Sequence, residues 1–585
     1  MVFRTPSDSC QQKNVLNMLR CNLQWHLVLL NFLTCGLEIC VAAGITYVPP
    51  LLLEAGVEEQ YMTMVLGIGP VLGLLFIPLI GSASDHCSSR YGRRRPFIWL
   101  LSLGVLLALF IIPHADVFAS FIGWGGRALQ VAFLILGVAL LDFCGQVCFT
   151  PLEALLSDLY HDEESCGQAF AMFSFMVSLG GCVGYLLPAL DWSESYLSVY
   201  LGGQEECLFA LLTGIFVVSV LVTMKMSEEP GYPPHCPVLE TKPLEGTRCV
   251  PRSCCYLLKY KFRISKSGPL MCLVRTCWSM TPAIYRSYCH IPRVMRQLCV
   301  AQLCSWMAVM SFMLFYTDFV GEGLYQGVPS AAPGTASRLR YDEAHLTNLV
   351  LFLYSAITRA GFIGIRMGSL GLFLQCATST FFSLVMSKLV KLFGSRRVYL
   401  TSMVSFTLSA LVICLSKSIV LVTMMSALTG FAYATLQTLP YTLTCHYHKE
   451  KEVYMPKAKT KNMHKNGITI TRESVYLAPE EECTMNHPEN THHCFRPDSA
   501  SYYTACNGNG EGGKQEDYGK RGVGLDFAIL DSTFLLSQVF PSLFMGMIVQ
   551  FTESVTAYIA SSTIFGFISI YLTNHIVFDQ KDLRF

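Results

Sequence analysis

The chain has 585 residues, of which 52% are hydrophobic and only 14% are charged, and its formal net charge is +1. A soluble globular protein carries about a quarter of charged residues, so this composition argues against a soluble enzyme and predicts an all-α membrane protein. The near-neutral charge also argues against a nucleic-acid partner, because such partners are bound by strongly basic surfaces. The expected surrounding of the chain is therefore a lipid bilayer.

Twelve apolar runs are long enough to cross a bilayer, which takes about 20 residues of helix. They fall into two groups of six, at 26–48, 62–82, 97–113, 129–150, 168–190 and 206–224, and at 298–320, 367–387, 398–416, 418–440, 525–549 and 555–578. The pattern predicts an N-terminal six-helix half (1–224), a central loop (225–297) and a C-terminal six-helix half (298–585). A long polar loop, 445–521, interrupts the second half.

The distribution of basic residues predicts the orientation of these runs. The central loop holds twelve lysines and arginines against four glutamates, which by the positive-inside rule places it in the cytoplasm. The basic loops at 90–95 and 388–397 agree with this if both termini are also cytoplasmic, and the loop 445–521 then lies on the same side. We therefore expect a multi-pass protein of the plasma membrane or of an intracellular vesicle membrane.

A further apolar segment, 344–365, is long enough to suggest a thirteenth span. It contains Arg359, and a central arginine costs about 2.5 to 3.5 kcal/mol on insertion scales. If this segment crossed the membrane, the basic loop at 388–397 would also move to the outside. We therefore predict that 344–365 is a non-spanning insertion.

The loop after the second run has a recurring pattern of glycine, aspartate and arginine. From Gly81 it reads Gly-x-x-x-Asp-x-x-x-x-Arg-x-Gly-Arg-Arg, and a similar basic loop with Gly394 follows the eighth run. This repetition indicates a weak internal duplication, and the pattern is similar to the signature of the major facilitator superfamily, in which two six-helix halves hold the solute at the bilayer midplane. We predict that Asp85 pairs with an arginine and closes a cytoplasmic gate; the alternative is that these charges only set topology. The candidate gating residues are Asp85, Arg90, Arg93 and Arg94.

Acidic residues within the apolar runs are costly and are therefore candidates for function. Glu38 lies in the first run and Asp142 in the fourth, where Gln146 and Glu153 follow one and three turns later on the same helix face. A low-dielectric surrounding favours the neutral form of a carboxyl group, so Asp142 or Glu38 can take up a proton outside and release it inside. The alternative is that both acids only bind neighbouring helices.

Three polar side chains near these acids are candidates for solute binding. They are Gln146, Glu153 and, in the eleventh run, Asp531. No phosphate-binding motif accompanies them, so transport would run on a proton gradient without a cofactor.

Cysteines and histidines outside the apolar runs predict no metal site. Cys483, His487 and Cys494 carry atoms that bind zinc, but their spacing matches no standard zinc finger. Cys254 and Cys255 lie beside basic residues and are candidates for palmitoylation, with an unmodified pair as the alternative.

With these residues in place, the chain resembles the solute carrier 45 family, the animal relatives of the plant proton–sucrose symporters. The resemblance extends over all twelve runs and rests on the segments 36–38, 43–50, 90–98, 141–146, 151–158, 315–326, 530–538 and 541–546. It implies proton-coupled symport of sucrose, glucose or fructose by alternating access, with Asp142 as a coupling group. In the family pattern, the positions that match 343 and 366 are adjacent, so 344–365 looks inserted. Glu153 stands at the position where plant members carry arginine.

The predicted partners are thus a small sugar, protons and lipid, and we expect the chain to act as a monomer. Two alternatives stay open. One is a carrier of a different small solute, and the other is a membrane sensor or scaffold that does not transport.

Overall fold

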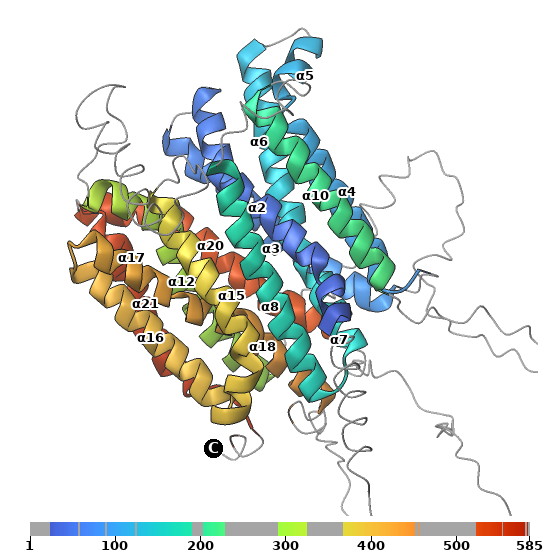
Figure 1. The fold of residues 1–585 in the computed structure, drawn as a ribbon, viewed down its shortest axis with the longest axis vertical. Helices are drawn as coiled ribbons and strands as arrows, with labels where there is room; N and C mark the ends of the chain where they lie inside the picture. Colours follow the sequence, from blue (N-terminus) through green and yellow to red (C-terminus); the bar gives the residue numbers. More distant parts are fainter. Residues whose placement is uncertain are drawn as a thin grey trace, which may run out of the picture. The chain divides into compact units, whose positions relative to one another are not determined.

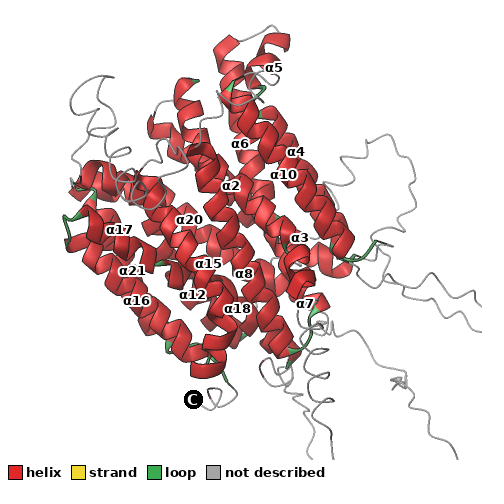
Figure 2. Cartoon of the chain, viewed as in Figure 1, coloured by secondary structure: helices red, strands yellow, loops and turns green. Residues whose placement is uncertain are grey.

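A computed structural model describes residues 24–55, 59–87, 91–122, 126–189, 203–227, 291–324, 367–450, 454, 522–552, 554–579 and 582. Within these ranges every regular element is a helix and no strand occurs (Figure 2). Arg90, the cysteine pair at 254–255, the segment 344–365 and the Cys/His cluster at 483–494 lie outside the described residues. Residues 457–521 also lie outside them.

The first group of helices precedes residue 228. It comprises α2 (Phe32–Glu54), α3 (Glu59–His86), α4 (Arg95–Ile111), α5 (Ala115–Ile122), α6 (Gly126–Val147), α7 (Phe149–Leu159), α8 (Glu163–Leu186), the short 3-10 helix η1 (Leu187–Ala189) and α10 (Gln204–Met226). The helix 24–30 and α2 meet at a bend of 42°, and α4 and α5 meet at a bend of 76°. The pair α6 and α7 runs as one span over Arg127–Leu159.

The second group of helices begins at residue 293. It comprises α12 (Arg293–Asp318), the π-helical turn η2 (Phe319–Leu324), α15 (Met367–Phe393), α16 (Ser395–Leu415), α17 (Ile419–Leu428), α18 (Gly430–Lys449), α20 (Val523–Thr552) and α21 (Thr556–Thr573). The pair α17 and α18 forms one span over Ile419–Lys449. Both α12 and α18 thus extend by several residues into segments that the sequence assigns to loops.

The described residues contain ten helices long and apolar enough to cross a membrane, or up to twelve if each bent pair is one span. The predicted all-α membrane protein is thereby confirmed. The outer surface of the bundle agrees with a lipid surrounding: exposed side chains on α4 include Leu100, Leu103, Leu107 and Phe110, whose spacing makes one apolar stripe. The division into two halves and the loops between them stay predictions.

The two loops that the sequence pairs as a duplication both turn on a glycine. Gly92, before α4, has φ 102°, and Gly394, before α16, has φ 83°. Only glycine adopts this left-handed region without a steric penalty. The shared backbone conformation therefore supports a duplication that sequence similarity alone indicates weakly.

Two long helix contacts join the first group to the second. α3 packs along α20, and α8 packs along α15 and α18 (Figure 1). A Cβ atom on Gly81 of α3 would lie 2.6 Å from the backbone oxygen of Gly524, so the α3–α20 contact depends on a missing side chain. On the other side, Ser174 and Ser178 of α8 bond Ser383 and Ser379 of α15 at 2.8 and 2.7 Å.

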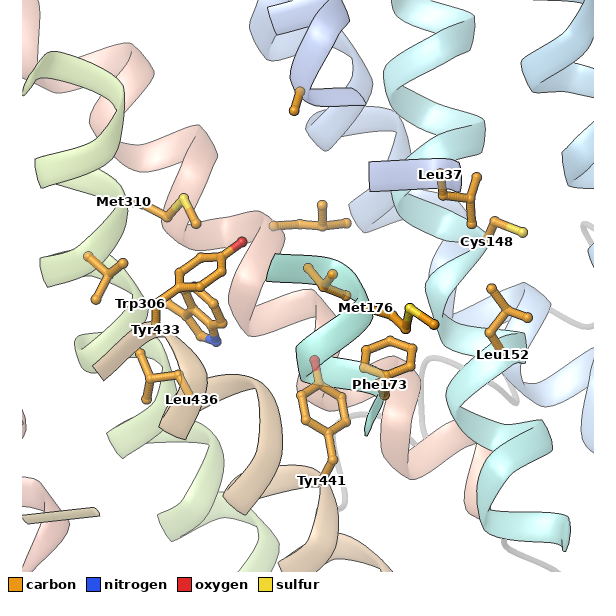
Figure 3. Close-up of a cluster of buried hydrophobic side chains, with 14 of the residues drawn as sticks. Leu37, Cys148, Leu152, Phe173, Met176, Trp306, Met310, Tyr433, Leu436 and Tyr441 are labelled. Carbon is orange, nitrogen blue, oxygen red and sulfur yellow. The ribbon is translucent and has the colours of Figure 1, made fainter. Parts of the chain in front are cut away.

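The apolar core is continuous between the two groups. Figure 3 shows Leu37, Leu152 and Phe173 of the first group in the same buried cluster as Trp306 and Tyr441 of the second. Polar side chains are set into this core, half-buried on α6 and buried on α7 and α20, and these positions hold the candidate site.

Candidate functional site

Arg94 is the centre of a buried ion cluster at one end of the bundle, which we call the basic end because it carries the arginine loop 91–95. Its side chain is fully buried. Its guanidinium donates to Asp158 Oδ2 at 2.9 Å, Asp85 Oδ1 at 2.6 Å and Ser84 Oγ at 2.5 Å. Burial alone would lower the pKa of Arg94, but the carboxylates of Asp85 and Asp158 outweigh it and raise the pKa above its usual value. Arg94 therefore stays charged without water around it.

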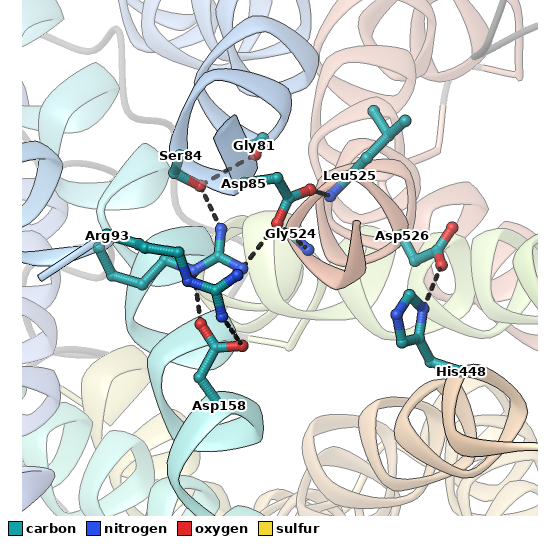
Figure 4. A network of polar contacts seen from close by, with 10 residues as sticks. Gly81, Ser84, Asp85, Arg93, Asp158, His448, Gly524, Leu525 and Asp526 are labelled. Carbon is teal, nitrogen blue, oxygen red and sulfur yellow. Dashed lines mark hydrogen bonds and ion pairs between the residues drawn. The ribbon is translucent and has the colours of Figure 1, made fainter. Parts of the chain in front are cut away.

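Asp85 connects this cluster to the second group of helices. Its two carboxylate oxygens accept hydrogen bonds from the backbone N–H groups of Gly524 at 3.0 Å and Leu525 at 2.9 Å (Figure 4). The first N–H groups of a helix lack partners within the helix and carry partial positive charge, so a carboxylate there is stabilising. Asp85 thus fastens the start of α20 to the end of α3.

The predicted gating residues therefore have different partners. Arg94 pairs with Asp85 as expected, whereas Arg93 lies half exposed and pairs with Asp158 at 3.1 Å. Arg90 lies outside the described residues. Sequence reasoning did not place Asp158 in the gate; its position five residues after Glu153, on the same helix, is the signal that connects the two.

A second cluster lies further from the basic end and joins α7 to α20. Asp531 of α20 accepts hydrogen bonds from Thr150 Oγ1 at 2.5 Å and from the hydroxyl of Tyr441 at 2.9 Å. Glu153 of α7 interacts with both Asp531 and Tyr441. Glu153 is 2% exposed and Asp531 is 6% exposed. Two carboxyl groups from different helix groups thus share one dry site.

A third cluster contains Asp142 and lies one turn or more beyond Thr150 along the same span. The Gln146 amide donates to Asp142 Oδ1 at 2.7 Å and to Gln538 Oε1 of α20 at 3.1 Å. Gly69 of α3 leaves room for this arrangement, since a Cβ atom there would lie 2.7 Å from Asp142 Cγ. Asp142 is thereby connected through Gln146 to the second group of helices.

The three polar residues predicted on one face of the fourth run thus belong to two clusters. α6 ends at Val147 and α7 begins at Phe149. Asp142 and Gln146 lie before this break with Gln538, and Glu153 lies after it with Asp531.

Glu38 of α2 lies apart from these clusters and faces three other helices. A Cβ atom on Gly180 of α8 would lie 2.8 Å from Glu38 Cβ. Its carboxyl group acts electrostatically on Tyr185 of α8, Cys376 of α15 and Tyr433 of α18. Glu38 therefore lies where helices of both groups meet.

Beside Tyr433 lies an aromatic group that sequence reasoning missed. The Trp306 ring contacts Tyr433 edge-on at 5.7 Å and Phe534 at 4.7 Å, and Gln437 bonds the Tyr433 hydroxyl. Trp306 Nε1 and Gln437 Oε1 are buried without hydrogen-bond partners among the described residues. Unpaired buried polar atoms cost about 1 to 3 kcal/mol, which a bound solute would recover.

A sequence signal for Trp306 did exist. Tryptophan in spanning helices concentrates at the two membrane interfaces, whereas Trp306 lies in the middle of α12.

As to metals, none of the described residues form a group of three or more histidine, cysteine or acidic side chains that could hold an ion.

Proteins similar to this chain are membrane carriers. The sequence model of the Major Facilitator Superfamily matches residues 27–364. Solute carrier family 45 member 3 from Mus musculus is 51% identical over 95% of this chain and 96% of its own length. Proton-associated sugar transporter A from Homo sapiens is 22% identical over 71% of this chain and 76% of its own length. The crystal structure of a human organic anion transporter has a TM-score of 0.54 at 14% identity and covers 94% of this chain and 99% of that one, which shows a common fold.

Proposed function

The chain belongs to solute carrier family 45 of the major facilitator superfamily, and from this premise we propose that it is a proton-coupled importer of small sugars. Membership confirms the predicted superfamily fold and makes the chain a membrane transporter and not an enzyme. The name of one relative, proton-associated sugar transporter A, supports the sugar and proton assignments.

The observation that carries the proton assignment is the link from Asp142 to Gln538. Gln146 bonds both residues at once, and they belong to different helix groups. A protonated Asp142 accepts from Gln146 more weakly than the carboxylate does, because hydrogen bonds to charged groups are the stronger ones. Proton uptake would therefore weaken the bond that holds Gln146 in position to donate to Gln538, and so weaken the contact between the two groups. Coupling of proton binding to a rocking motion requires such an effect.

The group around Trp306 supports the sugar assignment. Sugars present apolar ring faces and many hydroxyls, and this site offers aromatic rings with an unpaired donor at Trp306 and an unpaired acceptor at Gln437. Glu38 acts on the same tyrosine, Tyr433, and is the second candidate for proton coupling. Gln146 is available for solute as well, since its Oε1 has no hydrogen-bond partner in the described part of the chain.

We place the basic end in the cytoplasm by the positive-inside rule. The contacts of Asp85 with Gly524 and Leu525 then close the carrier toward the cytoplasm, and the solute enters from the other side. A membrane potential of 100 mV provides about 2.3 kcal/mol per proton moved, which concentrates a neutral solute roughly 40-fold. The protein would act as a monomer in the plasma membrane or in a vesicle membrane.

Uptake of radiolabelled sucrose, glucose and fructose into proteoliposomes tests this function. With a neutral interior, acid outside should stimulate uptake, and Asp142→Asn should abolish the stimulation. Asp116→Asn, which changes an exposed acid on α5, is the matched control and should behave as wild type. If no sugar shows acid-stimulated uptake by the wild type, proton-coupled sugar import is wrong.

A small organic cation is the second candidate solute. The spanning helices carry buried Asp531 and Glu153, with Glu38 and Asp142, whereas every described lysine and arginine on them lies within two turns of a helix end. An interior with acids and no bases attracts cations. Inhibition of sugar uptake by alkylamines, or amine uptake without sugar uptake, would favour this candidate.

A further inference from the structure

The contact between Glu153 and Asp531 joins two acids across the interface of the helix groups. Glu153 belongs to α7, whereas Asp531 belongs to α20, 378 positions later in the sequence. Both side chains are more than nine-tenths buried. The pair therefore exists only while α7 and α20 are packed against each other.

The hydrogen-bond partners of these two carboxyl groups fit one protonated and one ionised acid. Asp531 accepts from Thr150 on one oxygen and from Tyr441 on the other, which satisfies a carboxylate. Glu153 contacts Asp531 and Tyr441, and its Oε2 has no partner among the described residues. Two adjacent carboxyl groups in a dry site cannot both be ionised, so one of them holds a proton.

The titratable groups around the pair do not supply a compensating positive charge. Tyr441 and Cys445 face it from α18, and the thiol of Cys166 on α8 contacts Cys445. Toward the basic end, Arg94 is bound to Asp85 and Asp158, and His448 is bound to Asp526 at 3.1 Å. Asp142 lies on the other side with Gln146.

An aromatic layer separates the pair from the basic end. The ring of Tyr441 stacks on Phe170 of α8 at 5.8 Å and on Phe527 of α20 at 6.0 Å. Phe527 lies one helical turn nearer the start of α20 than Asp531 does. The rings belong to both helix groups, so movement of the two groups apart would separate them and admit water from the basic end to the carboxyl pair.

We propose that Glu153 and Asp531 are a proton site shared by the two helix groups, which holds one proton while the basic end is closed and releases it to water when that end opens. On opening, the two carboxyl groups separate and ionise, and the single proton passes to the water that enters. Closing requires that one proton return, because two carboxylates would repel each other across the interface. The proposal rests on the proposed function and assigns these two residues to proton coupling and not to solute binding.

Glu153→Gln tests the assignment, because glutamine has the shape of the protonated acid and cannot release a proton. In proteoliposomes, exchange of labelled for unlabelled sugar should stay within about twofold of wild type, since exchange needs no net proton movement. Accumulation driven by a one-unit pH gradient should fall about tenfold, because each coupled proton contributes one factor of ten. Asp531→Asn should give the same result, and the double variant should be no worse than either.

Wild-type accumulation in Glu153→Gln would overturn the proposal. Loss of exchange together with accumulation in a folded Glu153→Gln would also overturn it, because that result assigns Glu153 to solute binding. Asp116→Asn serves again as the matched control.

A second measurement needs no solute. Cys166 and Cys445 belong to different helix groups and contact each other at the basic end, so copper phenanthroline with oxygen should join them as a disulfide when that end is closed. A protease site introduced between 228 and 290 lets the disulfide be detected. After cleavage, the two fragments run together on a denaturing gel only while the disulfide is intact, and reductant separates them. Cys445→Ser identifies the bond.

As the pH rises, the cross-linking yield of the wild type should fall below the yield of Glu153→Gln measured at the same pH. Loss of the shared proton leaves two negative charges that push the helix groups apart. Higher pH also makes the thiols more reactive, but this effect is the same in the glutamine variant and drops out of the comparison. Parallel yields in the two proteins at every pH would contradict the proposal. If the wild type transports no tested solute but its yield depends on Glu153 in this way, the proposed function fails and the shared proton site stands.

Discussion

Asp85 and Leu525 are 440 positions apart, and the carboxylate of Asp85 accepts a hydrogen bond of 2.9 Å from the backbone N–H of Leu525. The same carboxylate also bonds Gly524 and Arg94. One side chain thus connects the arginine loop, α3 and the start of α20. Because a helix start attracts negative charge, this connection depends on the charge of Asp85 and not only on its shape.

We therefore predict that Asp85→Asn opens the basic end. Asparagine keeps the size of the side chain but loses the charge, and hydrogen bonds to charged groups contribute about 1.5 to 3 kcal/mol. The ratio of closed to open protein at the basic end should fall about tenfold or more. The measurement is the yield of the Cys166–Cys445 disulfide at fixed pH. An unchanged yield, with Asp116→Asn as reference, would mean that other contacts hold this end closed.

The two neighbouring arginines should differ in their effect on stability. Arg94 is fully buried and its removal leaves the buried carboxylate of Asp85 without its arginine partner, which costs about 3 to 5 kcal/mol for a buried pair. Arg93 is 47% exposed, and an exposed ion pair contributes about 0 to 1 kcal/mol after screening by solvent. We expect Arg94→Ala to lower the melting temperature in detergent strongly and Arg93→Ala to leave it nearly unchanged. Equal shifts would contradict the structural difference between them.

The sequence predicted the helices well because about 20 apolar residues in a row leave few alternatives in a bilayer. It ended the fourth run at 150, whereas the span continues to Leu159. The missed part contains Glu153 and Asp158, which lie beyond the end of the apolar run although the sequence places Glu153 on the same helix face as Asp142. Both acids contact residues that are distant in the sequence, Asp531 in the case of Glu153 and Arg94 in the case of Asp158, and a local pattern carries no information about such partners.

The candidate site was predictable only in part for the same reason. Asp142 with Gln146, and Asp85 with Arg94, are close in sequence, so spacing alone brought them together. The contact of Gln146 with Gln538 crosses between the helix groups. A single sequence does not show which faces of two helices meet, so pairs of this kind required the structure.

Gly69 offers a test of the Asp142 cluster that changes no polar group. A Cβ atom at Gly69 would lie 2.7 Å from Asp142 Cβ and Cγ, whereas at Gly67 it would meet nothing within 4 Å. Overpacking of this kind costs about 1 to 3 kcal/mol. We predict that Gly69→Ala reduces acid-stimulated uptake about tenfold and lowers the melting temperature, while Gly67→Ala changes neither. A normal Gly69→Ala would show that Asp142 can move without loss of coupling.

Trp306→Phe tests whether the indole N–H binds solute. Trp306 Nε1 has no hydrogen-bond partner among the described residues, so its removal breaks no hydrogen bond with them. A hydrogen bond to a bound sugar contributes about 0.5 to 1.5 kcal/mol, so KM for sugar should rise about two- to tenfold. The maximal rate should change little, because the ring contacts with Tyr433 and Phe534 are mostly kept.

The control for this variant is Trp99→Phe, at a position on α4 that is 48% exposed on the outer surface. It loses the same N–H group at a place where lipid and not solute is the neighbour, so its KM should equal that of the wild type. If both variants raise KM equally, the effect is a general one of tryptophan loss. If neither does, the unpaired indole N–H does not contact the sugar, and the solute site lies closer to Gln146 and Gln538, where Gln146 Oε1 is a buried acceptor without a partner in the described ranges.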